Sequence, residues 1–440
     1  VAGRFIVTLC YARRNIVAIL KVTHRDRALH QVPSEGDGEE WVYQIGIPLQ
    51  ISPTECGIVL NIRRAHILTG DLEIGNDLVI LDRLDRISTD RIFPLNRSDT
   101  RPNPRTGRPT LFARYPLVGG FVPIGAKRPD GSAHPHAGTG FAVSQVIGFP
   151  CESTIQWAAD LPAEDRYHAM ELQQVAYDGR DFTVSSSALL DDADLHPDWS
   201  LTAPGLCHAI PDGDDLLMGF AGSRDGRSGR AGVLRWRREE QVWRSVAFVP
   251  ITEDSSGEAT LVRDTDGSLL FTARGGGASE NAMRLWRSAD GGAIWEKLLD
   301  QDQIRAGSPI SLNRCADGAL YFAGNPHRKT DSLGRALRSN DMRETLLLWP
   351  LAPDLRSLLD PIMARDCAAD FGPALPGSIW IADHPVGLTV RLADGRWRHV
   401  FCYRVLDRDE VARDAPTTPY TGTYVEEVLS DGEGGGLWEF

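Results

Sequence analysis

The stretch Ser288–Trp295 decides the fold of this chain, and it reads SADGGAIW. It directly follows Arg284–Arg287, in which the apolar pair Leu285-Trp286 is typical of a β-strand. The Asp290 side chain can accept hydrogen bonds from backbone N–H groups of its own turn. Glycines supply backbone angles that other residues rarely adopt. We expect Trp295 to pack the turn onto the sheet, so the stretch predicts a tight hairpin in an all-β protein.

Turns that contain Asp-Gly recur along the chain and separate short β-type runs. Asp-Gly between apolar runs is a strong hairpin signal, because both residues tolerate a positive φ. The turns return roughly every 35–80 residues, which is typical of four-stranded propeller blades with loop insertions. The sequence predicts six blades, at 111–157, 168–199, 206–247, 257–297, 308–350 and 377–402 combined with 423–440. The Asp-Gly turns begin at Asp178, Asp212, Asp266, Asp317, Asp394 and Asp431.

The first hundred residues differ from the rest and carry no motif. They contain several strand-like runs joined by charged turns. Residues 96–109 are rich in Pro, Arg, Asn and Thr and are interpreted as a linker. We therefore expect a β-rich segment over residues 1–100 and a propeller over residues 101–440. The ring has seven blades if the first segment contributes one.

Composition narrows the class of protein. The 440 residues carry a net charge of −13, which argues against binding to nucleic acid or to anionic membranes. The sequence contains no run of about 18 apolar residues, so we expect no membrane span. Seven scattered cysteines without a CxxC pair are typical of free thiols, and slightly favour a cytoplasmic location. The chain begins at Val1, so secretion after removal of a signal peptide stays open, as does the oligomeric state.

The turn at Ser288–Trp295 resembles the Asp box, or BNR repeat, of the sialidase (neuraminidase) superfamily. The resemblance covers residues 111–440 as separated motifs. It implies a six-bladed β-propeller of the sialidase type. It also implies an exo-glycosidase that cleaves a terminal acidic sugar, sialic acid or a related one, from a glycan without any cofactor. The expected partner is therefore an acidic oligosaccharide.

Two motifs resemble the sialidase arginines that clamp the sugar carboxylate. The first is FARYP at residues 112–116, in which Arg114 takes the place of the first clamp arginine. The second is a hairpin that begins at Glu258, turns at Asp266-Gly267 and ends at Arg274. The resemblance makes Arg274 the second clamp arginine and Glu258 the acid/base partner of the nucleophile. An arginine fork suits a carboxylate, because it donates two parallel charge-assisted hydrogen bonds.

The nucleophile and the third arginine follow from further resemblances. The segment YVEEVLSDG from Tyr424 resembles the last sialidase hairpin and implies that Tyr424 is the nucleophile, with Tyr420 as a rival. A phenol needs a base to become nucleophilic, which would be Glu258. Asn325-Pro326 followed by Arg343 resembles the segment with the third clamp arginine. Competing candidates for that role are Arg335, Arg338 and Arg391.

The largest departure from the family concerns the acid. The loop after the first motif, residues 127–141, offers Asp130 within a plain Asp-Gly turn together with His134 and His136. A histidine can act as an acid or a base near neutral pH. Asp130 or His136 is therefore the expected acid, with His134 as a substrate contact. Tyr167, at the start of the next blade, is a further candidate for substrate binding, beside His168 and Glu171.

Two other functions fit the same residues. A propeller polysaccharide lyase would use a histidine or tyrosine to remove a proton next to a uronic acid carboxylate that arginines neutralise. The histidines of the 127–141 loop motivate that alternative. The second is a carbohydrate-binding propeller without activity, because a fold does not imply a function.

Overall fold

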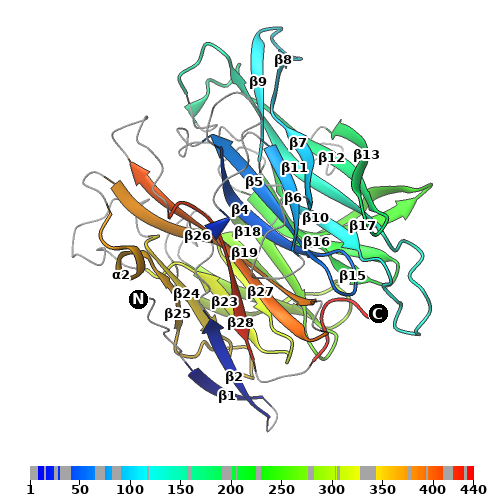
Figure 1. Ribbon diagram of the computed structural model, residues 1–440, viewed down its shortest axis with the longest axis vertical. Coiled ribbons are helices and arrows are strands. Elements are labelled where there is room, and N and C mark those ends of the chain that lie inside the picture. Colours follow the sequence, from blue (N-terminus) through cyan, green and yellow to red (C-terminus); the bar gives the residue numbers. More distant parts are fainter. Residues whose placement is uncertain are drawn as a thin grey trace.

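The protein is an all-β six-bladed propeller in its computed structural model (Figure 1). Among the described residues the one helix is α2 (Cys367–Phe371), which Asp366 caps by accepting from the Ala369 amide. The described residues are 8–13, 16–23, 28–29, 41–64, 75–81, 91–115, 118–155, 160–190, 201–204, 206–223, 229–275, 282–302, 304, 308–327, 343–374, 378–392, 395–409, 420–430 and 434–440.

The first two blades come from residues 41–190. Blade 1 consists of β4 (Trp41–Gln50), β5 (Cys56–Arg64), β6 (Gly75–Leu81) and β7 (Ile92–Arg97). Blade 2 consists of β8 (Asp99–Pro102), β9 (Pro109–Arg114), β10 (Val118–Val122), β11 (Thr139–Pro150), β12 (Tyr167–Tyr177) and β13 (Phe182–Leu190).

Blades 3 and 4 share one continuous sheet, because β18 (Val242–Arg263) passes from one to the other. Its first half pairs with β17 and its second half with β19. Blade 3 contains β14 (Leu201–Pro204), β15 (Ile210–Asp212), β16 (Asp215–Ser223) and β17 (Gly229–Glu239). Blade 4 continues with β19 (Leu269–Gly275), β20 (Ala282–Ser288) and β21 (Glu296–Asp302).

The last two blades complete the ring. Blade 5 consists of β22 (Ser311–Arg314), β23 (Leu320–Gly324), β24 (Thr345–Pro350) and β25 (Ile362–Asp366). Blade 6 starts from the inside with β26 (Ser378–Arg391), β27 (Trp397–Asp409) and β28 (Gly422–Leu429). Its outer strands are β1 (Thr8–Arg13), β2 (Ile16–Thr23) and the short β3 (Ala28–Leu29).

The early part of the chain belongs to the ring itself. β2 pairs with β28, so the dark-blue strands lie beside the red one in Figure 1. β4 packs against β26 and β27, which brings blade 1 against blade 6. The expected blades at 111–157 and 168–199 are in fact one sheet, since β11 pairs with β12. The sixth blade comes from residues 41–97, and the boundary expected at residue 100 lies inside β8.

The turn at Ser288–Trp295 has the hydrogen bonds that its sequence predicts. Asp290 accepts from the Ser288 hydroxyl and from the backbone amides of Ala293 and Ile294. The Trp295 indole donates to the carbonyl of Gly292, and its ring meets that of Phe271 edge-on. This turn therefore fastens the outer hairpin of blade 4 onto the strand whose far end carries Arg274.

Candidate functional site

Two inner strands of the ring are interrupted by β-bulges, and each bulge carries an ionisable residue. β18 is irregular between Ser255 and Ala259, and β26 between Asp383 and Val386. At these bulges Glu258 has a φ of 20° and His384 a φ of 53°. Bulges re-aim side chains, and residues with unusual backbone angles cluster at functional sites. The two strands thus present Glu258 and His384 to the same region.

Glu258 and Arg274 form an ion pair across the β18–β19 hairpin. Arg274 Nη1 lies 3.0 Å from Glu258 Oε1 and 2.9 Å from Oε2. The exposed fractions of the two side chains are 22% and 23%, so solutes can reach both. Burial raises the pKa of Glu258, but the nearby positive groups, Arg274 first, outweigh it and hold this pKa below its ordinary value. Glu258 is therefore a carboxylate at neutral pH.

Asp383 binds two arginines, Arg343 of blade 5 and Arg404 of blade 6. It is completely buried, and its carboxylate accepts from Arg343 at 2.6 Å and from Arg404 at 2.8 and 2.9 Å. Burial raises the pKa of Asp383, but Arg404, His384 and Arg343 together hold it well below its ordinary value. The Arg343 carbonyl accepts from the amide of Ala382 on β26. Arg343 is thereby fixed at both its main chain and its side chain.

His384 completes the group. Its Nδ1 lies 2.8 Å from Asp383 Oδ1, so a proton on Nδ1 leaves Nε2 as the reactive atom. Burial lowers the pKa of His384, and the opposing charge of Asp383 does not cancel that effect. The imidazole interacts electrostatically with Glu258. We call the set of Glu258, Arg274, Arg343, Asp383, His384 and Arg404 the central cluster.

The central cluster has a clear electrostatic character. Three guanidinium groups face two carboxylates, and the histidine is neutral at neutral pH because of its lowered pKa. One positive charge is therefore in excess. Arg274 and Arg343 are close enough to influence one another electrostatically. This arrangement can attract a substrate carboxylate while it offers a carboxylate and an imidazole for proton transfer or nucleophilic attack.

Only part of the central cluster was predicted from the sequence. Glu258, Arg274 and Arg343 were expected in one site, and the structure brings them together. Arg335 and Arg338 lie outside the described residues. The rival Arg391 donates to the carbonyl of Gly395 in the turn after β26, and thus lies at the other end of that strand.

Arg114 lies in an ion-pair network within its own blade. Its side chain is 5% exposed and binds Glu171 on β12 and Asp99 on β8, at 3.1 and 2.8 Å. Because both carboxylates belong to blade 2, the guanidinium ties β8, β9 and β12 together. Tyr167 is buried in the same blade and meets Phe112 edge-on. Blade 2 thus uses both residues in its own packing.

Tyr424 lies between blades 5 and 6. Its hydroxyl donates to the carbonyl of Tyr420, its ring stacks on Tyr403, and the Arg365 guanidinium lies 4.9 Å from its ring centre. β28 is the third strand from the inside of its blade, about 10 Å outward from β26 at the usual strand spacing. Burial raises the pKa of Tyr424, which disfavours the phenolate. The chain thus positions Tyr424 as part of an aromatic layer, at a distance from the bulge that carries His384.

The loop with the expected acid lies at the opposite end of the axis from Glu258. His134 meets the ring of Trp438, whose neighbour Leu437 lines the same cavity as Asp264, the first residue of the turn after β18. That turn joins β18 to β19 at the end away from Glu258 and Arg274. His136 packs edge-on against Trp243, and burial lowers the pKa of both histidines. These two histidines are therefore separated from Glu258 by the length of the inner strands.

Asp130 lies in the same loop and has a local role. It is exposed and accepts from both the amide and the hydroxyl of Ser132, which lower its pKa. It forms the turn that its Asp-Gly sequence predicts. Together with the two histidines, Asp130 belongs to the end of the ring that we call the turn end, where β18 and β22 end.

Three members of the central cluster were missed by sequence reasoning. Asp383 and His384 form a polar pair inside the apolar strand β26, directly before Pro385. Two ionisable residues followed by proline in a buried strand predict a bulge, and that signal was available. Arg404 carries no comparable signal in the sequence. Its role follows only from the structure, in which β27 pairs with β26 and Arg404 lies opposite Asp383.

Other kinds of site are not indicated by the described side chains. Among the residues that the structure covers, no group of three or more His, Cys, Asp or Glu could hold a metal ion. No helix within those ranges is long and apolar enough to cross a membrane. The cysteines whose side chains the structure describes, at 56, 151, 207, 315, 367 and 402, are free thiols.

Comparison with solved structures supports the propeller architecture. No family model and no curated protein matches this chain. Among solved structures, a protein of unknown function from Dyadobacter fermentans superposes with a TM-score of 0.54 at 12% identity, covering 92% of this chain and 98% of that one. The Hadza microbial sialidase Hz136 superposes with a TM-score of 0.52 at 13% identity, covering 88% of this chain and 66% of that one. The chain therefore has the fold of a sialidase-type β-propeller.

Proposed function

We propose that this protein is a glycosidase that removes an acidic sugar from the end of a glycan, with the central cluster as its active site. The observation that carries the proposal is the pair of bulges that brings Glu258 and His384 within electrostatic range of one another, together with Arg274 and Arg343. The fold supports the same class of substrate, because one of the similar solved structures is that of a sialidase.

Substrate binding would use the arginines. Arg274 and Arg343 come from different blades and are each partly exposed, so a sugar carboxylate can lie between them. Charge-assisted hydrogen bonds from two guanidinium groups would fix both the position and the orientation of the sugar. Asp383 keeps Arg343 and Arg404 in place without meeting solvent.

Bond cleavage would use the other two residues. Protonated His384 would donate its Nε2 proton to the glycosidic oxygen as the bond from that oxygen to the anomeric carbon breaks. Buried Asp383 would stabilise this imidazolium through Nδ1. Ionised Glu258 would take a proton from a water that attacks the anomeric carbon, or would attack that carbon itself to form a glycosyl ester that water then hydrolyses. The released products would be the free acidic sugar and the shortened glycan.

The test is an activity screen against glycans that end in sialic or uronic acids, with released sugar detected by mass spectrometry. Glu258→Gln and His384→Asn should each lower kcat by about 10²–10⁴-fold, the usual contribution of an acid or base. Asp130→Asn and His136→Asn are the matched controls and should retain activity. Full activity in Glu258→Gln, or its loss in His136→Asn, would refute the assignment of the site.

A polysaccharide lyase is the second candidate, and the lowered pKa of His384 favours it. A neutral imidazole could remove the C5 proton next to a uronate carboxylate that Arg274 and Arg343 neutralise, while the C4–O bond to the neighbouring sugar breaks and a C4–C5 double bond forms. The product would be an unsaturated uronate, which absorbs in the ultraviolet, whereas hydrolysis yields a product without that absorbance. Binding without any turnover, unchanged by Glu258→Gln, would instead identify a carbohydrate-binding propeller.

A further inference from the structure

The inner edge of blade 6 is held by side chains of blade 5. Among the described strands, β26 pairs only with β27, so one side of its main chain faces the neighbouring blade. Buried N–H and C=O groups on such an edge need partners from elsewhere, because an unpaired group is costly. Two buried asparagines of blade 5, Asn313 and Asn325, provide partners for β26. The bulge that carries Asp383 and His384 lies between their two points of attachment.

Asn325 attaches to the strand before the bulge. It directly follows β23, and Pro326 after it favours an extended backbone at this position. Its side-chain nitrogen donates to the carbonyls of Ala382 and Thr345, at 2.7 and 2.8 Å. Its side-chain oxygen accepts from the Ser308 hydroxyl. Asn325 thus ties the start of β24 to the last residue of β26 before the bulge.

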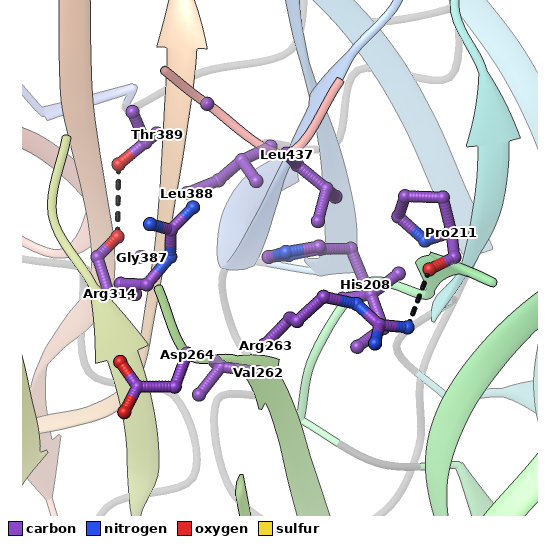
Figure 2. A pocket seen from close by; sticks show the side chains of 12 residues that line it. His208, Pro211, Val262, Arg263, Asp264, Arg314, Gly387, Leu388, Thr389 and Leu437 are labelled. Carbon is purple, nitrogen blue, oxygen red and sulfur yellow. Dashed lines mark hydrogen bonds between the residues drawn. The ribbon is translucent and has the colours of Figure 1, made fainter. Parts of the chain in front are cut away.

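Asn313 attaches to the strand after the bulge. It lies on β22, and its side-chain oxygen accepts from the Gly387 amide at 2.8 Å, while its side-chain nitrogen donates to the Ser311 hydroxyl. Gly387 permits this approach, because a Cβ there would lie 2.9 Å from Asn313 Oδ1. The two strands stay together toward the turn end, where the Thr389 hydroxyl donates to the Arg314 carbonyl at 3.0 Å (Figure 2).

The two attachment points face the same blade only because of the bulge. Main-chain groups alternate between the two sides of a regular strand, and Ala382 and Gly387 are an odd number of positions apart. In a regular strand they would therefore face opposite sides. The bulge adds one residue, since β26 advances three positions from Asp383 to Val386 while β27 advances two. Both groups are thereby turned toward the asparagines of blade 5.

We propose that Asn325 and Asn313 are positioning residues of the central cluster, which hold β26 in its bulged register and so keep His384 beside Glu258. This positioning role rests on the function proposed for that cluster. Both asparagines are buried and act through the main chain of β26. Without their hydrogen bonds the extra residue loses its support, and a slip of one residue turns the side chains that follow to the opposite face of a strand.

Histidine NMR during a pH titration of the whole protein follows His384 without any need for activity. Its signal is identified by its loss in His384→Asn. Burial lowers the pKa of His384 in the intact site, so Asn325→Ala and Asn313→Ala should each raise this pKa by at least about 0.5 unit toward its ordinary value. Both variants should also lower kcat at least about 10-fold, because a small displacement of a catalytic group is costly.

Gln174→Ala is the matched control. Gln174 is also a buried amide side chain that binds the main chain of a neighbouring blade, through the carbonyl and the amide of Trp243, but it lies toward the turn end. This variant should lower the urea midpoint of unfolding, as the asparagine variants do, while the pKa of His384 and kcat stay unchanged. Asn325→Ser, which keeps a polar group, should act as Asn325→Ala does and replaces it if that variant does not fold.

An unchanged or lower pKa of His384 in the asparagine variants would overturn the positioning role, and so would an equal rise in Gln174→Ala. If the wild type cleaves no glycan but the pKa rises as expected, the positioning role stands and the proposed function fails. If Glu258→Gln loses activity while the asparagine variants keep both kcat and the pKa of His384, the proposed function stands and the positioning role fails.

Discussion

Single residues set the acid–base chemistry proposed for the central cluster. Asp383 is buried with two arginines and one histidine around it, so its ionised form is stabilised where an isolated carboxylate would be unstable. His384 and Glu258 each have a pKa below the ordinary value, the first through burial and the second through nearby positive charge. The pH dependence of activity is therefore the property most closely tied to these residues.

The proposed hydrolysis requires Glu258 ionised and His384 protonated. Both pKa values are lowered, so activity should rise as Glu258 loses its proton and fall again as pH increases past the lowered pKa of His384. The optimum should lie in the acidic range, below the ordinary histidine pKa of about 6.5. A pH profile of kcat/KM measures this directly. A rate that only rises with pH to a plateau would favour the lyase, which needs neutral His384.

Tyr424 provides a second test at this scale. Tyr424→Phe removes the hydrogen bond to the Tyr420 carbonyl and should lower the free energy of unfolding by about 1 kcal/mol. Activity should stay near the wild-type level, because the ring belongs to the layer between blades 5 and 6. Urea unfolding and kcat measured on the same preparation separate the two effects. A variant that folds normally but loses activity would restore Tyr424 as the nucleophile.

At the scale of elements, the two ends of the β18–β19 hairpin differ in their chemistry. Its tip is the Asp266-Gly267 turn, and its open end holds the Glu258–Arg274 ion pair. Gly257 immediately precedes Glu258 and has a φ of 133°, which a residue with a Cβ rarely adopts. The bulge therefore depends on this glycine.

Gly257→Ala should strain the bulge and displace Glu258. We expect a loss of about 1–2 kcal/mol in stability together with a reduction of kcat of about 10-fold or more. The matched control is Gly267→Ala, which also has a positive φ, of 88°, and open space where the new Cβ would lie. It should be destabilised to a similar extent with kcat unchanged. Equal kcat in the two variants would show that the bulge does not position Glu258.

The same hairpin shows what the sequence could and could not predict. The Asp-Gly turn and the spacing from Glu258 to Arg274 predicted two side chains at one end of a blade, because strand pairing follows from local pattern. The end of the ring at which a loop lies depends instead on the strands that flank it. Asp130 and His136 were expected in the site because their loop follows Arg114 in the sequence, but this loop joins β10 to β11 at the turn end, away from Glu258. The Asp383–Arg404 contact arises from pairing between two strands and needed the structure.

At the scale of the whole molecule, the first strands and the last residues of the chain both help to close the ring. β1 and β2 extend the sheet of β26 to β28, and the final residues pack at the turn end. The carbonyl of Glu439 accepts from the Lys127 amide, and the Trp438 side chain is buried in a core shared by several blades. The turn end is therefore closed by a segment that is short but densely packed.

Trp438→Ala should show how much this closure contributes. Removal of a buried aromatic side chain typically costs about 3–5 kcal/mol, and urea unfolding should show a loss of that order. Ile294→Ala is the control, because Ile294 is 74% exposed and its truncation should have little effect. A negligible change in Trp438→Ala would mean that the ring closes without its last residues.

In the proposed mechanism an acidic sugar binds in the middle of the ring, between Arg274 and Arg343, and is cleaved beside Glu258. The most direct measurement is a crystal structure of Glu258→Gln with a glycan that ends in an acidic sugar. The sugar carboxylate should lie within hydrogen-bonding distance of both guanidinium groups, with the glycosidic oxygen facing His384 Nε2. A glycan bound at the turn end, or one whose carboxylate contacts neither arginine, would contradict this mode of binding.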